Sequence, residues 1–289
     1  MKISLGPIQH YWPADKVKHF YSQVAGWPLD IVYLGENICS KRQELSMLEW
    51  LYIADMLTEA GKEVVLSTLV QVESESDLKS VIEICENGDY KVEANTESAI
   101  RRAFGRPFVA GPSLKSNEDN VLKDIKYNGG VRWVMPVGFS SERLHSICSS
   151  RPDDMQIEVF VYGGLPMSFS SNCITALAHH LTINECSYVC KKYFEGMEMS
   201  NDQMDDTLII NGFQIQPGSP CNLIGELKSL QSVGVDVIRI SPQLNQTYEI
   251  VENFSQVLNG TRMDNSFTGS KKWCNEYWHG TVKLERRTV

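Results

Sequence analysis

The sequence has no apolar run long enough to cross a membrane, since a spanning helix needs about 20 consecutive apolar residues. Residues 1–7 show neither a long apolar core nor a small-residue cleavage site, so we expect no signal peptide. Basic residues are scarce, with 27 Lys and Arg against 36 Asp and Glu, and the net charge is −9. Such a balance disfavours binding to nucleic-acid phosphates or to an acidic membrane surface. These absences predict a cytoplasmic protein whose eight cysteines are reduced or bound to a metal.

Several catalytic motifs are also absent. No Gly-x-Gly-x-x-Gly turn follows a first strand, and no Walker-type phosphate loop occurs, which disfavours nicotinamide and P-loop chemistry. The sequence contains no His-Glu-x-x-His zinc motif and no recognisable Ser/His/Asp or Cys/His nucleophile set. Peptidase activity is therefore disfavoured.

Short apolar segments alternate with segments of helical periodicity along most of the chain. Eight strands that alternate with helices predict a parallel sheet covered by helices, and the number favours a closed (β/α)₈ TIM-like barrel, formed as a single domain by residues 1–289, over an open doubly wound sheet. The predicted strands are residues 3–5, 30–36, 63–69, 90–95, 108–114, 131–137, 157–162 and 236–241. The first two helices are predicted to bury the stripes Val17, Phe20, Tyr21 and Val24, and Leu45, Leu48, Tyr52 and Met56.

The alternation is interrupted only between the seventh and eighth strands, where about 70 residues intervene. Within them we expect an insertion over residues 163–216, made of a cysteine-bearing loop and a hairpin around residues 208–215. Insertions of this size usually serve a functional site. The tail, residues 260–289, becomes aromatic at Trp273, Tyr277 and Trp278 and is expected to pack on the barrel or on a partner.

Three cysteines are concentrated in the insertion, with twelve residues between Cys173 and Cys186 and three between Cys186 and Cys190. In a reducing compartment such a cluster favours a metal or an iron–sulfur centre over disulfides. Cys39 follows the second strand, and the active face of a (β/α)₈ barrel lies at the carboxyl ends of the strands. The two cysteine-bearing segments should therefore meet over the same face, where four thiolates can converge.

The identity of the metal stays open at this point. Zinc and an iron–sulfur cluster both accept four thiolates, and His179 and His180 are either additional zinc ligands or solvated side chains. The remaining cysteines are isolated on or beside predicted helices, with Cys221 opening one, and are interpreted as small core residues: Cys85, Cys148, Cys221 and Cys274.

Polar residues at or near strand ends are further candidates. Glu93 and Glu158 lie within apolar strands, where an unpaired carboxylate is costly, so each needs a partner or faces the barrel mouth. Arg239 either pairs with one of them or binds an anionic substrate. The candidate catalytic residues are Glu36, Glu93, Glu158 and Arg239, and Thr68 and Ser241 also end strands.

Four basic residues lie beside the cysteines in the sequence. They either stabilise a reduced cluster through their charge or are solvated side chains. They are Lys41, Arg42, Lys191 and Lys192.

Residues 158–173 (EVFVYGGLPMSFSSNC), followed by Cys186 and Cys190, resemble the signature of the collagenase-like peptidase family U32. Typical members have His-Gly-Ala-Leu-Cys and then Ser-Gly-Arg-Cys, with a later pair of cysteines completing four cluster ligands. Here Tyr162 replaces the histidine and Pro166 replaces the first cysteine, so the usual ligand set is one short. The resemblance implies that Cys39 supplies the missing ligand.

Further segments are similar to the bacterial branch of this family that acts in oxygen-independent ubiquinone biosynthesis: residues 4–7 (SLGP), 33–42 (YLGENICSKR), 108–111 (FVAG) and 275–280 (NEYWHG). The resemblance implies a [4Fe–4S] cluster on Cys39, Cys173, Cys186 and Cys190. It also implies a heterodimer with a UbiU-like family member, a UbiT-like lipid-binding accessory protein, and prephenate as hydroxyl donor.

These implications describe a redox subunit of an oxygen-independent hydroxylase. The alternatives are a component that hydroxylates RNA, as relatives do, a peptidase, and a non-catalytic chain that supports its partner with a structural cluster.

Overall fold

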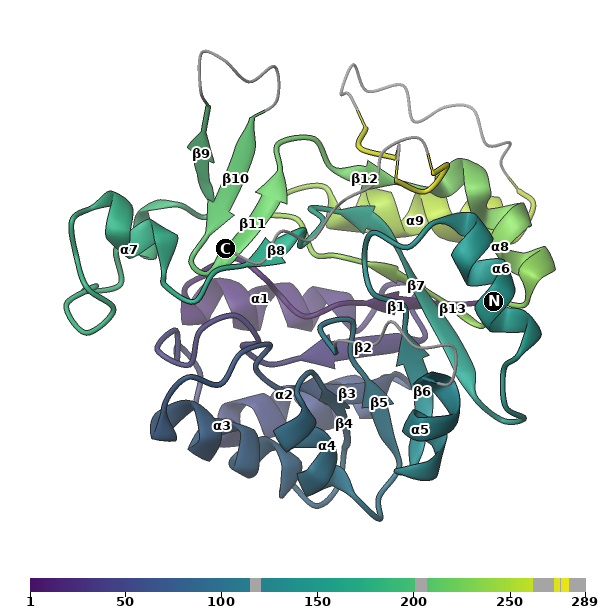
Figure 1. The fold of residues 1–289 in the computed structure, drawn as a ribbon, viewed down its shortest axis with the longest axis horizontal. Helices are drawn as coiled ribbons and strands as arrows, with labels where there is room; N and C mark the ends of the chain where they lie inside the picture. Colours follow the sequence, from purple (N-terminus) through teal and green to yellow (C-terminus); the bar gives the residue numbers. More distant parts are fainter. Residues whose placement is uncertain (115–120, 201–206, 262–272, 276, 281–289) are drawn as a thin grey trace.

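The computed structural model describes residues 1–114, 121–200, 207–261, 273–275 and 277–280. Eight parallel strands run in the order β7-β13-β1-β2-β3-β4-β5-β6, and β6 pairs back to β7 to close a barrel (Figure 1). The predicted TIM-like barrel is therefore confirmed. Its strands are β1 (Lys2–Leu5), β2 (Ile31–Leu34), β3 (Glu63–Ser67), β4 (Lys91–Ala94), β5 (Phe108–Ala110), β6 (Gly130–Val134), β7 (Gln156–Gly163) and β13 (Val237–Ile240).

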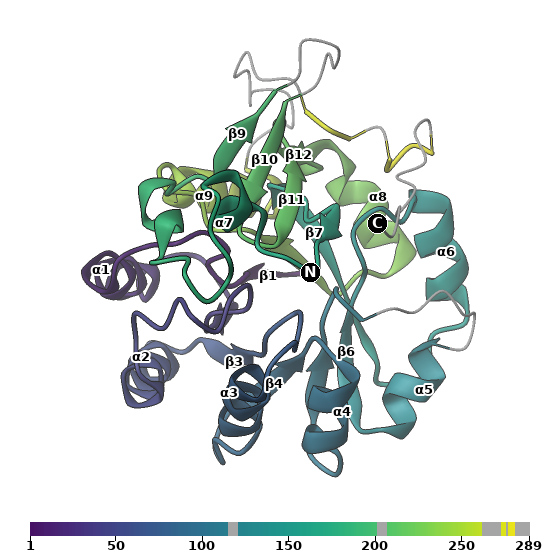
Figure 2. The ribbon, with the colours of Figure 1, turned by 60° about the vertical axis from the view of Figure 1, so that its left-hand side comes forward.

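Helices surround the barrel, as the end-on view in Figure 2 shows. Several begin at a Ser or Thr whose side chain accepts a hydrogen bond from the first helical turn, among them Ser46 and Ser74 in capping boxes. The helices are α1 (Ala14–Val24), α2 (Met47–Glu59), α3 (Glu75–Cys85), α4 (Glu97–Ala103), α5 (Val121–Tyr127), α6 (Ser141–Ser149), α8 (Leu227–Val233) and α9 (Thr247–Leu258). The stripe predicted for α1 is confirmed at Val17, Phe20, Tyr21 and Val24.

The buried face of α2 differs from the predicted one. Leu48 and Tyr52 were expected in the core, but they are 79% and 73% exposed, whereas Ile53 and Leu57 are buried. The other two residues of the predicted stripe, Leu45 and Met56, do contact the core. The helix begins only after Ser46, so extending its period back to earlier apolar residues assigned the wrong face. Two large apolar side chains therefore lie on the surface of α2.

Side chains alternate along each barrel strand, so every second residue points inward. On β13, Val237 joins an interior apolar layer, Arg239 comes next, and Ser241 follows at the carboxyl end. The apolar layer consists of Ile31, Tyr33, Val65, Val109, Val134 and Val237. A larger apolar core lies between the sheet and the helices.

A small antiparallel sheet is inserted between β7 and α8. Its strand order is β8-β11-β10-β9, and the hairpin predicted around residues 208–215 is confirmed as the β10–β11 pair. We call the described residues of 164–217 the cap. Its elements are β8 (Ser168–Phe169), α7 (Ile174–Ala178), η1 (Val189–Lys192), β9 (Met197–Met199), β10 (Leu208–Asn211) and β11 (Gln214–Pro217).

The chain after the cap departs from one prediction. Cys221 does not open a helix but forms the short strand β12 (Cys221–Asn222), antiparallel to β7, and η2 (Ile224–Glu226) precedes α8. The extended conformation lets Cys221 contact the Tyr277 hydroxyl at 3.3 Å.

The described part of the tail lies against the barrel, where the Trp278 carbonyl accepts a hydrogen bond from the Ser141 N–H. Of the predicted tail, residues 260–289, the segments 262–272 and 281–289 and residue 276 lie outside the described residues. Within the described part, no helix has both the length and the apolar character that a membrane crossing requires.

Candidate metal centre and barrel mouth

Four cysteines, one from the loop that follows β2 and three from the cap, line one small cavity between the two. The cavity has a volume of about 20 Å³, and its walls include Cys39, Cys173, Cys186 and Cys190. All four thiols are free of disulfides. We call this space the thiol cavity. The structure thus brings together the four cysteines that the sequence singles out.

The turn that carries Cys39 is shaped by its immediate neighbours. Gly35 has φ +115° and lies so close to β3 that an added Cβ would stand 3.0 Å from the Ser67 carbonyl oxygen, so the strand leaves the barrel at a point where glycine is required. The Glu36 carboxylate then accepts hydrogen bonds from the N–H groups of Ile38 (2.8 Å) and Cys39 (3.0 Å). Glu36 therefore orients the turn that presents the Cys39 thiol.

The cap presents its three cysteines from short, irregular elements. Cys173 is the residue before the first turn of α7, and the Cys186 carbonyl accepts from the Val189 N–H at 2.9 Å as η1 begins. Lys41 joins the two sides, because its ammonium donates to the Ile183 carbonyl at 2.7 Å. The barrel turn and the cap thus hold the thiols from opposite sides.

Arg42 is the buried cation of this region. Its Nη1 donates to the Gln9 carbonyl at 3.0 Å, and its Nη2 donates to Asn211 Oδ1 at 2.8 Å. Burial opposes its charge, but Glu36, Cys190 and Cys39 outweigh burial and raise the pKa of Arg42. The side chain therefore holds a positive charge beside the thiol cavity and ties the barrel to the cap.

The donor set fits a centre held by four thiolates. Burial raises the pKa of the Cys39 thiol to about 12 and also raises that of Cys173, so a metal has to displace protons when it binds. Among the described residues, no three His, Cys, Asp or Glu side chains stand close enough together for a single ion. A cubane cluster separates its ligands more widely than one tetrahedral ion does, so the shared cavity and the lack of a compact ion site are compatible.

The two histidines of the cysteine segment do not line the thiol cavity. His179 shares a 2.9 Å hydrogen bond with the Tyr193 hydroxyl, and His180 has a left-handed φ of 57°. Among the cysteines outside the cavity, Cys85 and Cys221 are buried.

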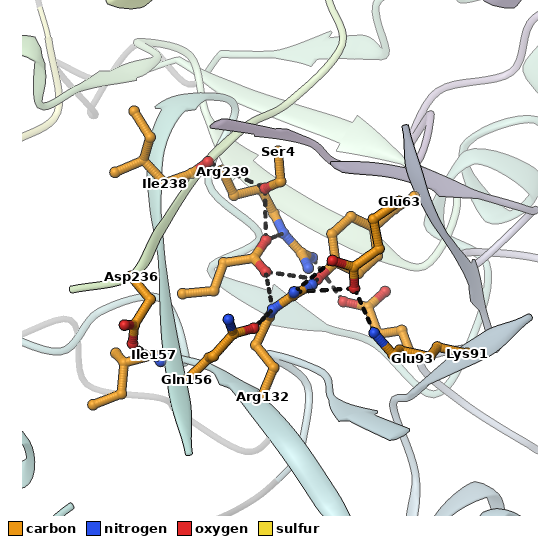
Figure 3. Close-up of polar contacts among 12 residues, drawn as sticks. Ser4, Glu63, Lys91, Glu93, Arg132, Gln156, Ile157, Asp236, Ile238 and Arg239 are labelled. Atoms are coloured by element: carbon orange, nitrogen blue, oxygen red, sulfur yellow. Dashed lines mark hydrogen bonds and ion pairs between the residues drawn. The ribbon is translucent and has the colours of Figure 1, made fainter. Parts of the chain in front are cut away.

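A second polar site fills the barrel interior below the mouth (Figure 3). Arg239 donates from Nε to Glu158 at 2.6 Å and from Nη1 to Glu93 at 2.7 Å. Arg132 contacts the other oxygen of Glu158 at 3.8 Å and reaches Glu63 at 3.1 Å. Arg239 thus pairs with both carboxylates that the sequence marks as needing a partner.

Hydrogen bonds complete the surroundings of the carboxylates. Glu158 accepts from the Ser4 hydroxyl at 2.7 Å and from the Tyr33 hydroxyl at 2.6 Å. Burial favours the neutral acid, but Arg239 and then Arg132 outweigh it and hold the pKa of Glu158 below its ordinary value. The Arg239 guanidinium carbon also lies 3.9 Å from the centre of the Tyr33 ring. We call this the barrel network: Ser4, Tyr33, Glu63, Glu93, Arg132, Glu158 and Arg239.

Between the barrel network and the cap lies a cavity of about 30 Å³, which we call the mouth chamber. Its lining includes Asn37 and Arg239 from the barrel side and Phe169 and Gln214 from the cap. Arg239 Nη2 and Asn37 Oδ1 are buried and have no hydrogen-bond partner among the described residues. No residue lines both the mouth chamber and the thiol cavity, although Asn37 stands two positions before Cys39.

The sequence did not single out several residues of these sites. Arg132 was detectable, since a charged residue in an apolar strand is the same signal that marked Glu93. Asn37, Gln9 and Asn211 carry no comparable signal, because amides are common on any surface loop.

A family model described as peptidase family U32 matches residues 114–282. Solved structures with a similar fold include the spore cortex-lytic enzyme SleL of Bacillus cereus (12% identity, 89% of this chain and 74% of that chain, TM-score 0.41). They also include a Clostridium thermocellum protein that binds two copies of 5-methyl-5,6,7,8-tetrahydrofolic acid (9% identity, 90% and 95%, TM-score 0.46). A third is the dihydropteroate synthase of Anaplasma phagocytophilum (10% identity, 91% and 99%, TM-score 0.42). Similarity at this level concerns the fold alone.

Proposed function

Since this chain belongs to peptidase family U32, we propose that it is a UbiV-like [4Fe–4S] protein that acts in oxygen-independent hydroxylation of the ubiquinone ring. The observation that carries the proposal is the thiol cavity, in which Cys39 meets three cysteines of the cap. Cys39 takes the place of the family cysteine that Pro166 replaces. The proposed partners are a UbiU-like family member and a UbiT-like accessory protein, with prephenate as hydroxyl donor.

When bound, the cluster would accept and release single electrons. Replacing a ring C–H by C–OH is a two-electron oxidation of the ring. A reaction without dioxygen therefore needs another acceptor for these two electrons. The protein's own residues prepare the site: Glu36 orients the Cys39 turn, Lys41 holds the cap loop, and Arg42 offsets thiolate charge.

The family name refers to peptidases, but the thiol cavity does not suggest one. A cysteine peptidase needs a base, usually histidine, within hydrogen-bond reach of its thiol. Among the described residues that line this cavity there are four cysteines and no histidine. The arrangement is that of a ligand set rather than of a nucleophile and its base.

Anaerobic purification of the chain, alone and with its UbiU-like partner, tests the proposal. We expect iron and acid-labile sulfide in amounts for one [4Fe–4S] cluster per chain, and an electron paramagnetic resonance signal after reduction. Cys39→Ala should lose the cluster as completely as Cys186→Ala, whereas Cys148→Ala, at a half-buried thiol outside the cavity, should keep it. Cluster retention in Cys39→Ala would refute the ligand set.

The proposed role in ubiquinone synthesis is tested in a strain that lacks this protein and is grown without oxygen. Wild-type protein should restore ubiquinone, and Cys39→Ala should not. Restoration by a variant shown to lack iron would contradict a redox role.

A further inference from the structure

Two cysteines outside the thiol cavity lie beside each other where the tail meets β12. Cys221 is the first residue of β12 and is fully buried, and Cys274 is half-buried against the same apolar core. Both are reduced in the structure. Neither lines the thiol cavity or the mouth chamber, so the chemistry of those sites gives the two thiols no role.

Backbone contacts hold the tail against β12 on both sides of this pair. The Cys274 N–H donates to the Pro220 carbonyl at 3.1 Å. Asn275 then accepts from the Asn222 N–H at 3.0 Å and donates to the Asn222 carbonyl at 2.6 Å. A hydrogen bond to the carbonyl that directly precedes Cys221 leaves the two cysteine Cα atoms about 5–7 Å apart. Since disulfides span Cα separations of about 4.4–6.8 Å, the two backbones already lie at bridging distance.

The two thiols are also electrostatic neighbours. Burial raises the pKa of Cys221 and that of Tyr277, whose hydroxyl lies 3.3 Å from Cys221 Sγ, and a charge on Cys274 raises both further. Burial likewise raises the pKa values of Cys85 and Cys148 to about 11, but no other cysteine contributes at either position. Among the described cysteines outside the thiol cavity, Cys221 and Cys274 thus form a pair.

The difference in exposure gives the two thiols different parts in an oxidation. Cys274 is partly open to solvent and Cys221 has no exposed surface, so a dissolved oxidant meets Cys274 first. Burial opposes ionisation of Cys221, and the hydrogen bond from Tyr277 partly offsets burial because it lowers the Cys221 pKa. A thiol that the fold holds beside its target reacts at a high effective concentration, which favours Cys221 as the second thiol to react.

We propose that Cys221 and Cys274 form a redox-active dithiol, which a low-molecular-weight disulfide such as oxidised glutathione converts to a disulfide bond between the tail and β12. Cys274 loses its proton, and its thiolate attacks one glutathione sulfur. A mixed disulfide forms, and the first glutathione leaves as a thiolate that takes up that proton. Cys221 then attacks the Cys274 sulfur, and the second glutathione leaves with the Cys221 proton. The protein has lost two electrons and two protons, and one oxidised glutathione has become two reduced ones.

The bond would fix the tail to the barrel covalently. β12 pairs with β7, and the Trp278 carbonyl of the tail accepts from the first residue of α6, so the bridge joins segments from both sides of the seventh strand. Closing a loop of about 50 residues restricts the unfolded chain, and the oxidised protein should melt roughly 5–10 °C above the reduced one. This inference goes beyond the proposed function and does not depend on the cluster.

Peptide mapping of the full chain tests the assignment, because trypsin leaves the two cysteines on separate peptides. Residues 193–228 contain Cys221, residues 273–283 contain Cys274, and neither peptide has another cysteine. The protein is incubated without oxygen in glutathione buffers with a rising share of the oxidised form, and remaining thiols are alkylated with N-ethylmaleimide. We expect a linked pair of these two peptides, which dithiothreitol separates.

Three results of the mapping would overturn the proposal. One is a glutathione adduct that persists on Cys274 while Cys221 is alkylated. The others are links from either cysteine only to the thiol cavity, and no oxidation of either cysteine. Equal melting temperatures of the linked and the reduced protein would overturn the covalent fixing of the tail.

Single substitutions separate the parts of the two thiols. Cys221→Ser should trap the glutathione adduct on Cys274, whereas Cys274→Ser should leave Cys221 unmodified, and neither variant should gain melting temperature on oxidation. Cys148→Ser, at another half-buried thiol, is the control and should form the linked peptides like wild type. A glutathione adduct on Cys221 in the Cys274→Ser protein would contradict the order of the two steps.

Tyr277→Phe tests the hydroxyl beside Cys221 and keeps the ring. Without the hydrogen bond the Cys221 thiolate is less stable, so the mixed disulfide should resolve about tenfold more slowly at neutral pH. The rate, followed by mass spectrometry, should also reach its plateau at a higher pH than in wild type. An unchanged pH profile would contradict this role of Tyr277.

Discussion

Arg42 Nη2 donates to Asn211 Oδ1 over 2.8 Å, and this bond joins the loop that carries Cys39 to the β10–β11 hairpin of the cap. The same guanidinium reaches the Gln9 carbonyl from Nη1. One buried side chain thus connects the first barrel loop, the loop after β2 and the cap.

Replacing Arg42 should therefore loosen the cap as well as change the charge at the thiol cavity. We expect Arg42→Ala to lose about 2–3 kcal/mol of unfolding free energy, because it leaves buried partners of a charged donor unpaired. It should also bind less iron after anaerobic reconstitution, and Arg42→Lys should be intermediate. Lys192→Ala, at an exposed cation of the same region, is the control, and an equal loss in both variants would contradict a specific role for Arg42.

The barrel network predicts a large cost for breaking a buried pair. Arg239→Met leaves Glu93 and Glu158 without their shared partner and should cost about 3–5 kcal/mol in urea unfolding. Lys18→Met, which breaks the exposed pair with Glu49, should unfold like wild type. If Arg239→Met were as stable as wild type, the network would not support the barrel.

Alanine substitutions at two glycines distinguish the effect of backbone strain from that of a close contact with a neighbouring side chain. Gly212 (φ +67°) and Gly260 (φ +71°) are both left-handed, and alanine at either should cost about 1–2 kcal/mol. At Gly212 an added Cβ would also stand 2.9 Å from Arg42 Nη2, whereas at Gly260 it meets nothing within 4 Å. Gly212→Ala should therefore have the lower melting temperature and the lower iron content. Equal losses at the two positions would mean that the hairpin tip yields without disturbing Arg42.

The burial of His10 predicts that the folded protein loses stability as the pH falls from 6.5 to 4. Burial, and then the charge of Arg42, lower the pKa of His10 from 6.5 to about 4. The unfolded chain takes up a proton near pH 6.5 and the folded chain only near pH 4, so stability is complete above pH 6.5 and falls as the pH drops to 4. The loss is at most about 3 kcal/mol.

His10→Gln should flatten the pH dependence of urea unfolding between pH 6.5 and 4. His145→Gln, at an exposed histidine of α6, should keep the wild-type slope. An unchanged slope in His10→Gln would assign the acid sensitivity to other groups. Below pH 4.5, protonation of Glu158, whose pKa is lowered, adds a further loss in all variants.

The barrel was predictable because its evidence is local. An apolar strand such as residues 157–162 is recognisable from its own side chains, and parallel topology then places the loop of Cys39 at the same end as the strand that leads to Cys173. Charged residues inside such strands, Glu93 and Glu158, pointed correctly to a buried partner in Arg239.

The buried face of α2 and the contacts between distant loops were not predictable in this way. The face of α2 that carries Leu48 and Tyr52 depends on which apolar residues reach the sheet, and periodicity alone chose the wrong one. The hydrogen bond from Arg42 to Asn211 and the position of Asn37 at the mouth chamber depend on how the cap packs on the barrel. Amide side chains give no advance sign of such placement.

The pairing of β1 with β13 has a consequence for synthesis of the protein. Lys2 pairs with Val237, so β1 is synthesised about 235 residues before the strand with which it pairs. At about 5–20 residues per second, that delay amounts to roughly 10–50 seconds. During this time Ile3 and Leu5 lack a neighbour on one side, and Cys39 emerges well before Cys173. The nascent chain is thus exposed to chaperones and oxidants before its ring of strands can close.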